Sequence, residues 1–134
     1  MKKRRYVFDS YALLAFFQGE AGGFQVRGLL DLAFRGEASV HLSYINLGEV
    51  FYIVERRFGG KKAREIVQDI QRLPMKLECP DLERVLEAAA IKAKFPVAYA
   101  DAFAAALAKE LGAVLVTGDP EFKRLGGHIE ILWL

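Results

Sequence analysis

The most constraining feature of this sequence is a repeated alternation between short β-type runs and longer segments with helical periodicity. The runs at residues 5–8, 39–42 and 113–116 are each followed by a segment whose apolar residues recur at three- and four-residue spacing. Such a chain covers its strands with crossover helices, which makes neighbouring strands parallel. The pattern predicts an α/β fold with a central parallel sheet of about five strands and helices on both faces.

The element boundaries follow from caps and breakers. Asp9-Ser10 and Ser43 are suited to begin helices, whereas Gly59-Gly60, Pro96 and Gly112 are suited to end them. The expected strands are residues 5–8, 39–42, 74–79, 113–116 and 129–132. The expected helices are residues 10–17, 24–34, 44–58, 61–72, 81–95, 99–111 and 119–125.

Length and charge limit the possibilities further. With 134 residues and 53% hydrophobic composition, the chain can bury one good core, so residues 1–134 are expected to form one domain. The formal net charge of +2 excludes a strongly cationic nucleic-acid coat protein, so any nucleic-acid binding must be local. A basic cluster around residues 56–64 and the neighbouring Tyr52 are interpreted as solvated charge and as core or dimer interface, respectively.

The cysteine content and hydropathy point to a cytoplasmic protein with no membrane association. Cys79 is the single cysteine, so it cannot form an intramolecular disulfide, and we expect it to be a small hydrophobic core residue. Charged residues or glycines interrupt every stretch before it reaches the roughly 20 apolar residues that span a bilayer.

Two carboxylates follow strands of the predicted sheet. Asp9 comes directly after residues 6–8, and Asp119 follows residues 114–116 through the short link Thr117-Gly118. In an open parallel sheet, ligands bind beyond the carboxyl ends of the strands. Both side chains are therefore expected at that edge.

Two more carboxylates lie on helices that begin near the same edge. Asn46 and Glu49 are three residues apart and share one helix face, a few residues after the second strand. Asp101 is in the first turn of its helix, where the positive end of the helix dipole favours an anion, and alanines surround it. Small neighbours allow close packing of that helix.

Four converging carboxylates would repel one another unless a hard divalent cation binds among them. Magnesium fits best and manganese can substitute, because both ions prefer oxygen ligands. No histidine or cysteine is among the proposed ligands, which argues against zinc. One or two ions are compatible with the pattern. The expected metal ligands and catalytic residues are Asp9, Glu49, Asp101 and Asp119.

Each acid alone has an ordinary structural explanation. Asp9-Ser10 is more often a helix cap than a ligand pair, and Asp119-Pro120 is typical of a turn. Glu49 alone is more often a solvated helix residue, although its apolar neighbours suggest a largely buried helix where an unpaired acid is costly, and Asp101 alone could be an ordinary first-turn acid. The site hypothesis depends on all four together.

The order and spacing of these motifs resemble the PIN-domain ribonucleases, most closely the VapC-type toxins of VapBC toxin–antitoxin systems. The resemblance covers nearly the whole chain. It rests on the segments Val7-Phe8-Asp9-Ser10, Asn46-Leu47-Gly48-Glu49, Tyr99-Ala100-Asp101 with its alanine helix, and Leu115-Val116-Thr117-Gly118-Asp119.

The resemblance implies a magnesium-dependent endoribonuclease that hydrolyses RNA phosphodiester bonds. It implies that Ser10 and Thr117 support the acids with their hydroxyls, and Asn46 is taken as a further supporting residue on the face of Glu49. It also implies a homodimer or higher assembly and an antitoxin that blocks the acidic pocket, with an arginine near the carboxylates.

Other functions remain open. A PIN-type nuclease for RNA processing or quality control, without an antitoxin, would have the same residues, and so would a catalytically inactive PIN binding module. A haloacid-dehalogenase phosphatase would need an acid where Tyr11 stands, and a receiver domain would need a lysine closer to the sheet than Lys123.

Overall fold

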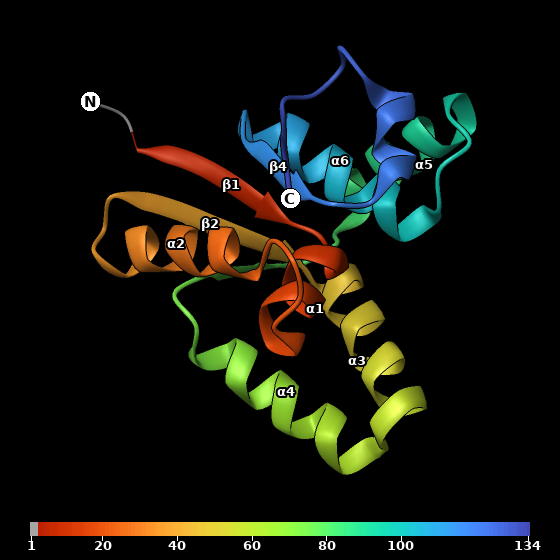
Figure 1. Cartoon of the computed structure of the whole chain (residues 1–134). Coiled ribbons are helices and arrows are strands. Elements are labelled where there is room, and N and C mark those ends of the chain that lie inside the picture. The colour runs from red at the N-terminus through yellow and green to blue at the C-terminus, as the bar shows by residue number, and fades with distance from the viewer. Residues whose placement is uncertain (1–2) are drawn as a thin grey trace.

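A computed structural model describes residues 3–134, so residues 1 and 2 of the expected domain lie outside it (Figure 1). Its five strands form one sheet in the order β3-β2-β1-β4-β5, and every neighbouring pair is parallel. The strands are β1 (Arg4–Phe8), β2 (Ala38–Ser43), β3 (Lys76–Glu78), β4 (Val114–Thr117) and β5 (Ile131–Trp133). The predicted α/β fold with a five-stranded parallel sheet is confirmed.

Helices cover both faces of this sheet. They are α1 (Ser10–Gln18), α2 (Gly23–Phe34), α3 (Tyr44–Phe58), α4 (Gly60–Arg72), α5 (Leu82–Lys94), α6 (Tyr99–Leu111) and the 3-10 helix η1 (Pro120–Leu125). Helices α1, α2 and α3 pack on one face of the sheet. Helix α6 lies against β1, β2 and β4 on the opposite face, and α5 packs on α6.

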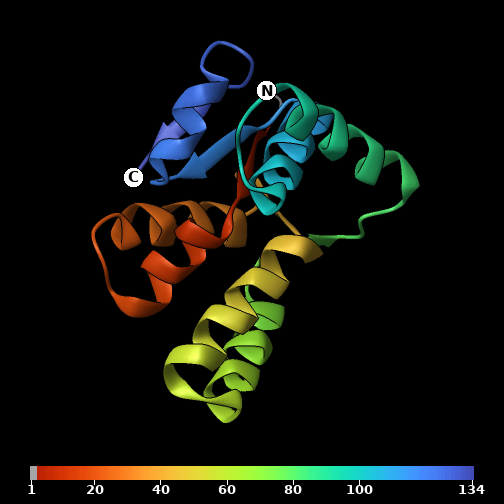
Figure 2. The ribbon, with the colours of Figure 1, turned by 90° about the vertical axis from the view of Figure 1, so that its right-hand side faces the viewer.

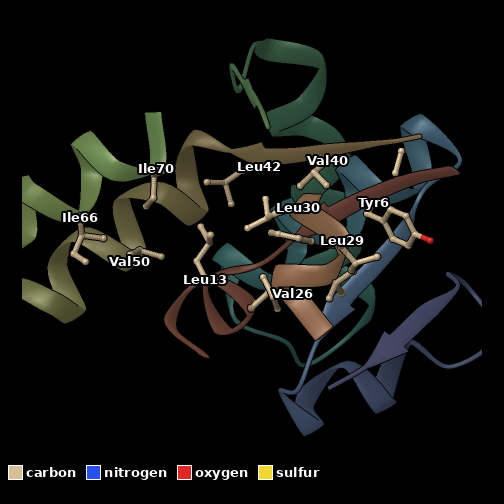
Figure 3. Packing of buried hydrophobic residues seen from close by; sticks show 14 of the residues in the cluster. Tyr6, Leu13, Val26, Leu29, Leu30, Val40, Leu42, Val50, Ile66 and Ile70 are labelled. Carbon is tan, nitrogen blue, oxygen red and sulfur yellow. The ribbon is translucent and has the colours of Figure 1, made fainter. Parts of the chain in front are cut away.

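The strand residues alternate between two cores. In β1, Tyr6 and Phe8 belong to the core beneath α1 to α4, whereas Val7 belongs to the core beneath α5 and α6. Figure 3 shows Tyr6 beside Leu29, with Val40 of the next strand close to the same helix α2. This period-two alternation places an apolar residue on each side of a central strand, which is why the strand is buried on both faces.

The strand order creates a natural binding position at the carboxyl edge of the sheet. From β1 the chain crosses toward β2, but from β4 it crosses toward β5 on the opposite side. Ligands in open α/β sheets bind where the strand order reverses in this way. A binding site is therefore expected at the edge formed by the ends of β1 and β4.

The α3–α4 hairpin projects away from the sheet (Figures 1 and 2). It begins at the carboxyl edge, where Ser43 ends β2 and caps α3 by accepting a hydrogen bond from the Ile45 amide at 3.2 Å. Gly59, with φ of 90°, makes the turn into α4, as Gly59-Gly60 predicts. The hairpin thus extends one side of the site outward.

The structure corrects four local expectations. The third strand is Lys76–Glu78 within the expected 74–79, the last strand is shifted to Ile131–Trp133, and the segment after Asp119 is a 3-10 helix. The prediction that Cys79 is a core residue is wrong, because β3 ends before it and its side chain is exposed. No helix in residues 3–134 is long and apolar enough to cross a membrane.

The inward-facing residue of β3 is Glu78, which anchors this edge of the sheet through buried polar contacts. Its Oε2 lies 2.8 Å from Nδ1 of His41 on β2, and its Oε1 accepts a hydrogen bond from Arg84 of α5 at 3.3 Å. Arg84 also donates two hydrogen bonds to Glu110 of α6. The buried side chain at this edge is therefore the charged Glu78 and not the expected Cys79.

Candidate metal centre

Asp9 is both a helix cap and a member of the site. It follows β1, is 1% exposed, and its Oδ1 accepts a hydrogen bond from the Ala12 amide at 2.9 Å. Its Oδ2 accepts a hydrogen bond from the hydroxyl of Thr117, at the end of β4. The cap and the ligand interpretations are therefore compatible, because one carboxylate oxygen serves the helix and the other faces the neighbouring strand.

Asp101 is held against the sheet by the packing of α6. The side chains of Ala102, Ala104 and Ala105 have no exposed surface, so the helix approaches the strands closely, as its small residues predict. Asn46 of α3 donates a hydrogen bond from Nδ2 to the Ala100 carbonyl at 3.2 Å, one residue before Asp101. Asp101 itself is 5% exposed.

Glu49 reaches the site from α3. It is partly buried, and its Oε1 accepts a hydrogen bond from the Ser10 hydroxyl. Ser10 is the first residue of α1, so this contact ties the acid on α3 to the cap of Asp9. Glu49 and Asp9 thus each accept a hydrogen bond from a hydroxyl group, of Ser10 and Thr117 respectively.

Asp119 caps the start of η1 and lies beside Glu121, an acid that the sequence analysis did not include in the site. Its Oδ1 accepts a hydrogen bond from the Glu121 amide at 2.9 Å. Carboxylate oxygens of Asp101, Asp119 and Glu121 all lie within 4.8 Å of one another. The signal was present, since an acid two residues after a capping Asp lies in the first turn of the same short helix.

The cluster has the electrostatics of crowded carboxylates. Burial raises the pKa of Asp9 to about 7, helped by the charges of Asp119 and Glu49, although the hydrogen bonds from Thr117 and Ala12 oppose the rise. Burial likewise raises the pKa of Asp101 to about 8, and the charges of Asp119, Glu49, Glu121 and Asp9 add to it. All four predicted acids, together with Glu121, therefore share one negative field.

Little positive charge compensates this field within the described part of the chain. The one basic side chain within 4.0 Å of a cluster carboxylate there is Arg124, whose Nη1 lies 3.8 Å from Glu121 Oε1 on the exposed rim. Asp9, Glu49, Asp101 and Asp119 form no ion pair among residues 3–134. A site of this kind gains stability by binding a cation.

The donor set fits a hard divalent cation. Carboxylate oxygens are the ligands that magnesium and manganese prefer, and no histidine or cysteine among residues 3–134 joins the group of close ligand atoms. Asn46 adds a neutral oxygen: its side chain is fully buried, and its Oδ1 has no hydrogen-bond partner within residues 3–134. Because buried amide oxygens are rarely left unpaired, this atom fits a hydrated ion nearby.

Comparisons with known proteins agree with this architecture. None of the curated protein sequences matches the chain significantly. Among solved structures, VapBC2 from Rickettsia felis bound to a promoter DNA fragment has a TM-score of 0.75 at 13% identity, covering 97% of this chain and 98% of that one. DNA-bound VapBC from Salmonella typhimurium has a TM-score of 0.73 at 20% identity, covering 96% and 97%.

A third similar structure is VapC20 from Mycobacterium tuberculosis, described as a sarcin–ricin-loop-cleaving toxin. Its TM-score is 0.71 at 17% identity, covering 90% of this chain and 95% of that one. At these identities the structures demonstrate a shared fold. The family model described as the PIN domain matches residues 6–128, which include every acid of the cluster. The chain therefore belongs to the PIN domain family.

Proposed function

We propose that this protein is a magnesium-dependent endoribonuclease that hydrolyses RNA phosphodiester bonds and serves as the toxin of a toxin–antitoxin pair. The observation that carries the proposal is the group of carboxylates at the point where the strand order reverses in a PIN domain. The description of the similar VapC20 as a toxin that cleaves the sarcin–ricin loop supports RNA as the substrate.

In this proposal some acids of the cluster bind the cation and others are catalytic residues. Asp101, Asp119 and Glu121 hold the cation, since their oxygens are already close together. Asp9 and Glu49, which share the negative field, complete the site as catalytic acids. A magnesium ion held by these residues, for which manganese could substitute, would supply activation of a water and stabilisation of charge on the leaving oxygen. The site can take one ion or two.

The supporting residues fix the orientation of the acids. Thr117 positions Asp9, Ser10 positions Glu49, and Asn46 holds the first turn of α6 through the Ala100 carbonyl. Each of these contacts joins two different elements, so it restricts the carboxylates before substrate arrives. Such preorganisation lowers the cost of reaching the reactive geometry.

The partner in this proposal is an antitoxin that closes a groove beside the site. A hollow of about 390 Å³ lies between α1 and the α3–α4 hairpin, lined by Leu14, Phe17, Val54 and Phe58 with Arg57 and Lys62 at its border. An apolar segment with acidic flanks would fit it, and an arginine from the same segment would neutralise the carboxylates. We further propose that the protein forms a homodimer or higher assembly, as the family resemblance implies.

The decisive experiment is RNA cleavage by the purified protein. We expect cleavage with magnesium or manganese, loss of cleavage with EDTA, and recovery when the ion is restored. Asp101→Asn should remove activity while circular dichroism stays native. Cleavage that persists in EDTA, or in a natively folded Asp101→Asn protein, would refute the proposed mechanism. A neighbouring small antitoxin gene whose product binds the chain would separate a toxin from an RNA-processing nuclease.

A further inference from the structure

One face of α3 continues from the acid cluster out along the projecting hairpin. Tyr52 and Arg56 follow Glu49 by three and seven residues, so all three side chains lie on the same side of the helix. The Arg56 guanidinium carbon lies 5.0 Å from the centre of the Tyr52 ring, which confirms that the two side chains are neighbours. At about 1.5 Å per residue, Arg56 lies roughly 10 Å along the helix axis from Glu49.

This face contributes little to the core. The buried side of α3 carries Asn46, Val50 and Val54, whereas Tyr52 keeps 44% of its surface exposed. Arg56 is exposed and forms no ion pair with the described residues. The pair offers a ligand an open aromatic face for stacking and, beside it, a positive charge without a salt-bridge partner among residues 3–134.

The charge of the surroundings identifies the kind of ligand. The acid cluster repels a polyanion, so a nucleic acid that reaches it needs cations close by. On the hairpin, Arg56 is followed by further exposed basic side chains with no ion pair among residues 3–134: Arg57, Lys61, Lys62 and Arg64. These five basic side chains outnumber the exposed acids of the hairpin beyond the acid cluster, which are Glu55, Glu65 and Asp69.

We propose that the Tyr52–Arg56 face of α3 binds single-stranded RNA leading away from the acid cluster. An unpaired base stacks on the Tyr52 ring, and a backbone phosphate of a following nucleotide pairs with Arg56. Bases inside a duplex hide their faces in the stack, so an aromatic platform of this kind selects unpaired nucleotides. This inference rests on the proposed ribonuclease function and adds to it the residues of α3 that hold the substrate strand and the path of that strand away from the acid cluster.

The test is binding of a fluorescein-labelled single-stranded RNA of roughly 12 nucleotides, and of the same RNA in a duplex, measured by fluorescence anisotropy. The Asp101→Asn protein with magnesium is the background, so that the probe is not cut. Tyr52→Ala and Tyr52→Phe address stacking, and Arg56→Gln addresses the phosphate contact. The matched controls are Phe34→Ala and Lys109→Gln, which change exposed residues at the other edge of the sheet.

We expect Tyr52→Ala to weaken single-strand binding by about 5- to 100-fold, the range of one lost base–aromatic stack, while Tyr52→Phe retains it. Arg56→Gln should reduce the slope of log affinity against log salt by about 0.7, the value for one phosphate contact on a single strand. Duplex binding should be weaker and insensitive to Tyr52→Ala. Both control variants should bind like the parent.

Three results would overturn the inference. Unchanged affinity in Tyr52→Ala together with an unchanged salt slope in Arg56→Gln, in a protein whose wild type cleaves RNA, would leave the nuclease proposal standing and remove this face from it. A change of oligomeric state in Tyr52→Ala, seen by light scattering, would make the face an interface between copies. A wild-type protein that neither binds nor cleaves RNA would refute the proposed function itself.

Discussion

The Thr117 hydroxyl donates a hydrogen bond to Oδ2 of Asp9, joining the ends of β4 and β1 where the strand order reverses. The Thr117 hydroxyl oxygen also accepts a hydrogen bond from the Asp119 amide at 3.0 Å. One buried hydroxyl thus sets the orientation of one cluster acid and the backbone of another. Because Phe8 and Val116 are directly paired in the sheet, the two acids cannot separate without breaking the strand pair.

Thr117→Val keeps the shape of the side chain and removes this hydroxyl. The Asp9 carboxylate loses a donor and the Asp119 amide loses its acceptor, so we expect the free energy of unfolding to fall by about 1–3 kcal/mol. The pKa of Asp9 should rise further, because the Thr117 hydrogen bond is what lowers it most. Urea unfolding measures the loss of stability. A more protonated Asp9 should bind magnesium more weakly, which titration of magnesium by calorimetry at neutral pH measures.

Thr117→Ser is the matched control, since it retains the hydroxyl and should keep magnesium affinity close to that of the wild type. If Thr117→Val and Thr117→Ser bind magnesium equally well, the hydroxyl has no role in positioning Asp9.

The stability of the metal-free protein should decrease as pH rises from about 4 to about 8. In the folded chain the pKa of Asp9 is about 7 and that of Asp101 about 8, against an ordinary value of 3.8. Within this window the folded state keeps protons that the unfolded chain has released, so raising the pH favours unfolding. Thermal melts in EDTA at pH 5 and pH 8 measure the difference.

The double variant Asp9→Asn/Asp101→Asn cannot titrate at these positions, so its melting temperature should vary much less with pH. A wild-type melting temperature that stays constant from pH 5 to pH 8 in EDTA, or a double variant with the same slope, would show that the two acids are ionised as in water.

The parts of the fold that local sequence chemistry controls were predictable. Asp9 and Ser43 cap α1 and α3 as their positions after strands indicate, and Gly112 ends α6 in the left-handed conformation that favours glycine. These signals depend on a few neighbouring residues. The positions of the four acids relative to the strands and helices indicated a shared site, and the family resemblance added the ribonuclease activity, which remains a proposal.

Features that depend on distant residues were not predictable in the same way. Local sequence places Glu121 close to Asp119. Its closeness to Asp101 depends on how η1 packs near the start of α6, which no local pattern predicts. The sequence suggests that Cys79 is a buried apolar residue of a strand. Its neighbour Glu78 is buried instead, because His41 of β2 and Arg84 of α5 contact the Glu78 carboxylate. Tertiary partners decided both outcomes.

Gly118 has no room for a side chain. A Cβ atom there would lie 2.3 Å from Cε1 of the Tyr11 ring, so the ring or the link between β4 and η1 must move in Gly118→Ala. Because Tyr11 is 38% exposed, its ring can turn toward solvent, and we expect a loss of about 0.5–1.5 kcal/mol in the free energy of unfolding, the cost of moving a side chain off its preferred rotamer. Chemical denaturation measures the loss.

The double variant Tyr11→Ala/Gly118→Ala removes the obstructing ring and tests the cause. It should be destabilised less than the sum of the two single variants, because the clash exists only when the ring and the methyl group are both present. Strict additivity would mean that Gly118 is required for another reason.

Magnesium should stabilise the folded protein through Glu121 as well as through the acids expected from sequence. The ion binds the folded state selectively, so at a free concentration of 100 times Kd it should add about 2.7 kcal/mol to the free energy of unfolding. Glu121→Gln removes one charge from the three closest carboxylates and nearly conserves shape. A tenfold weaker Kd would reduce the gain by about 1.4 kcal/mol.

Glu87→Gln on α5 is the matched control, because it removes the same charge from an exposed position outside the group of close carboxylates. Thermal melts with magnesium and with EDTA compare the three proteins. In EDTA, Glu121→Gln should be at least as stable as the wild type, since relief of repulsion with Asp101 and Asp119 offsets the lost contacts of Glu121. With magnesium, the wild type and Glu87→Gln should gain equally and Glu121→Gln less. Equal gains in all three would exclude Glu121 from the metal site, and no gain in the wild type would exclude the site itself.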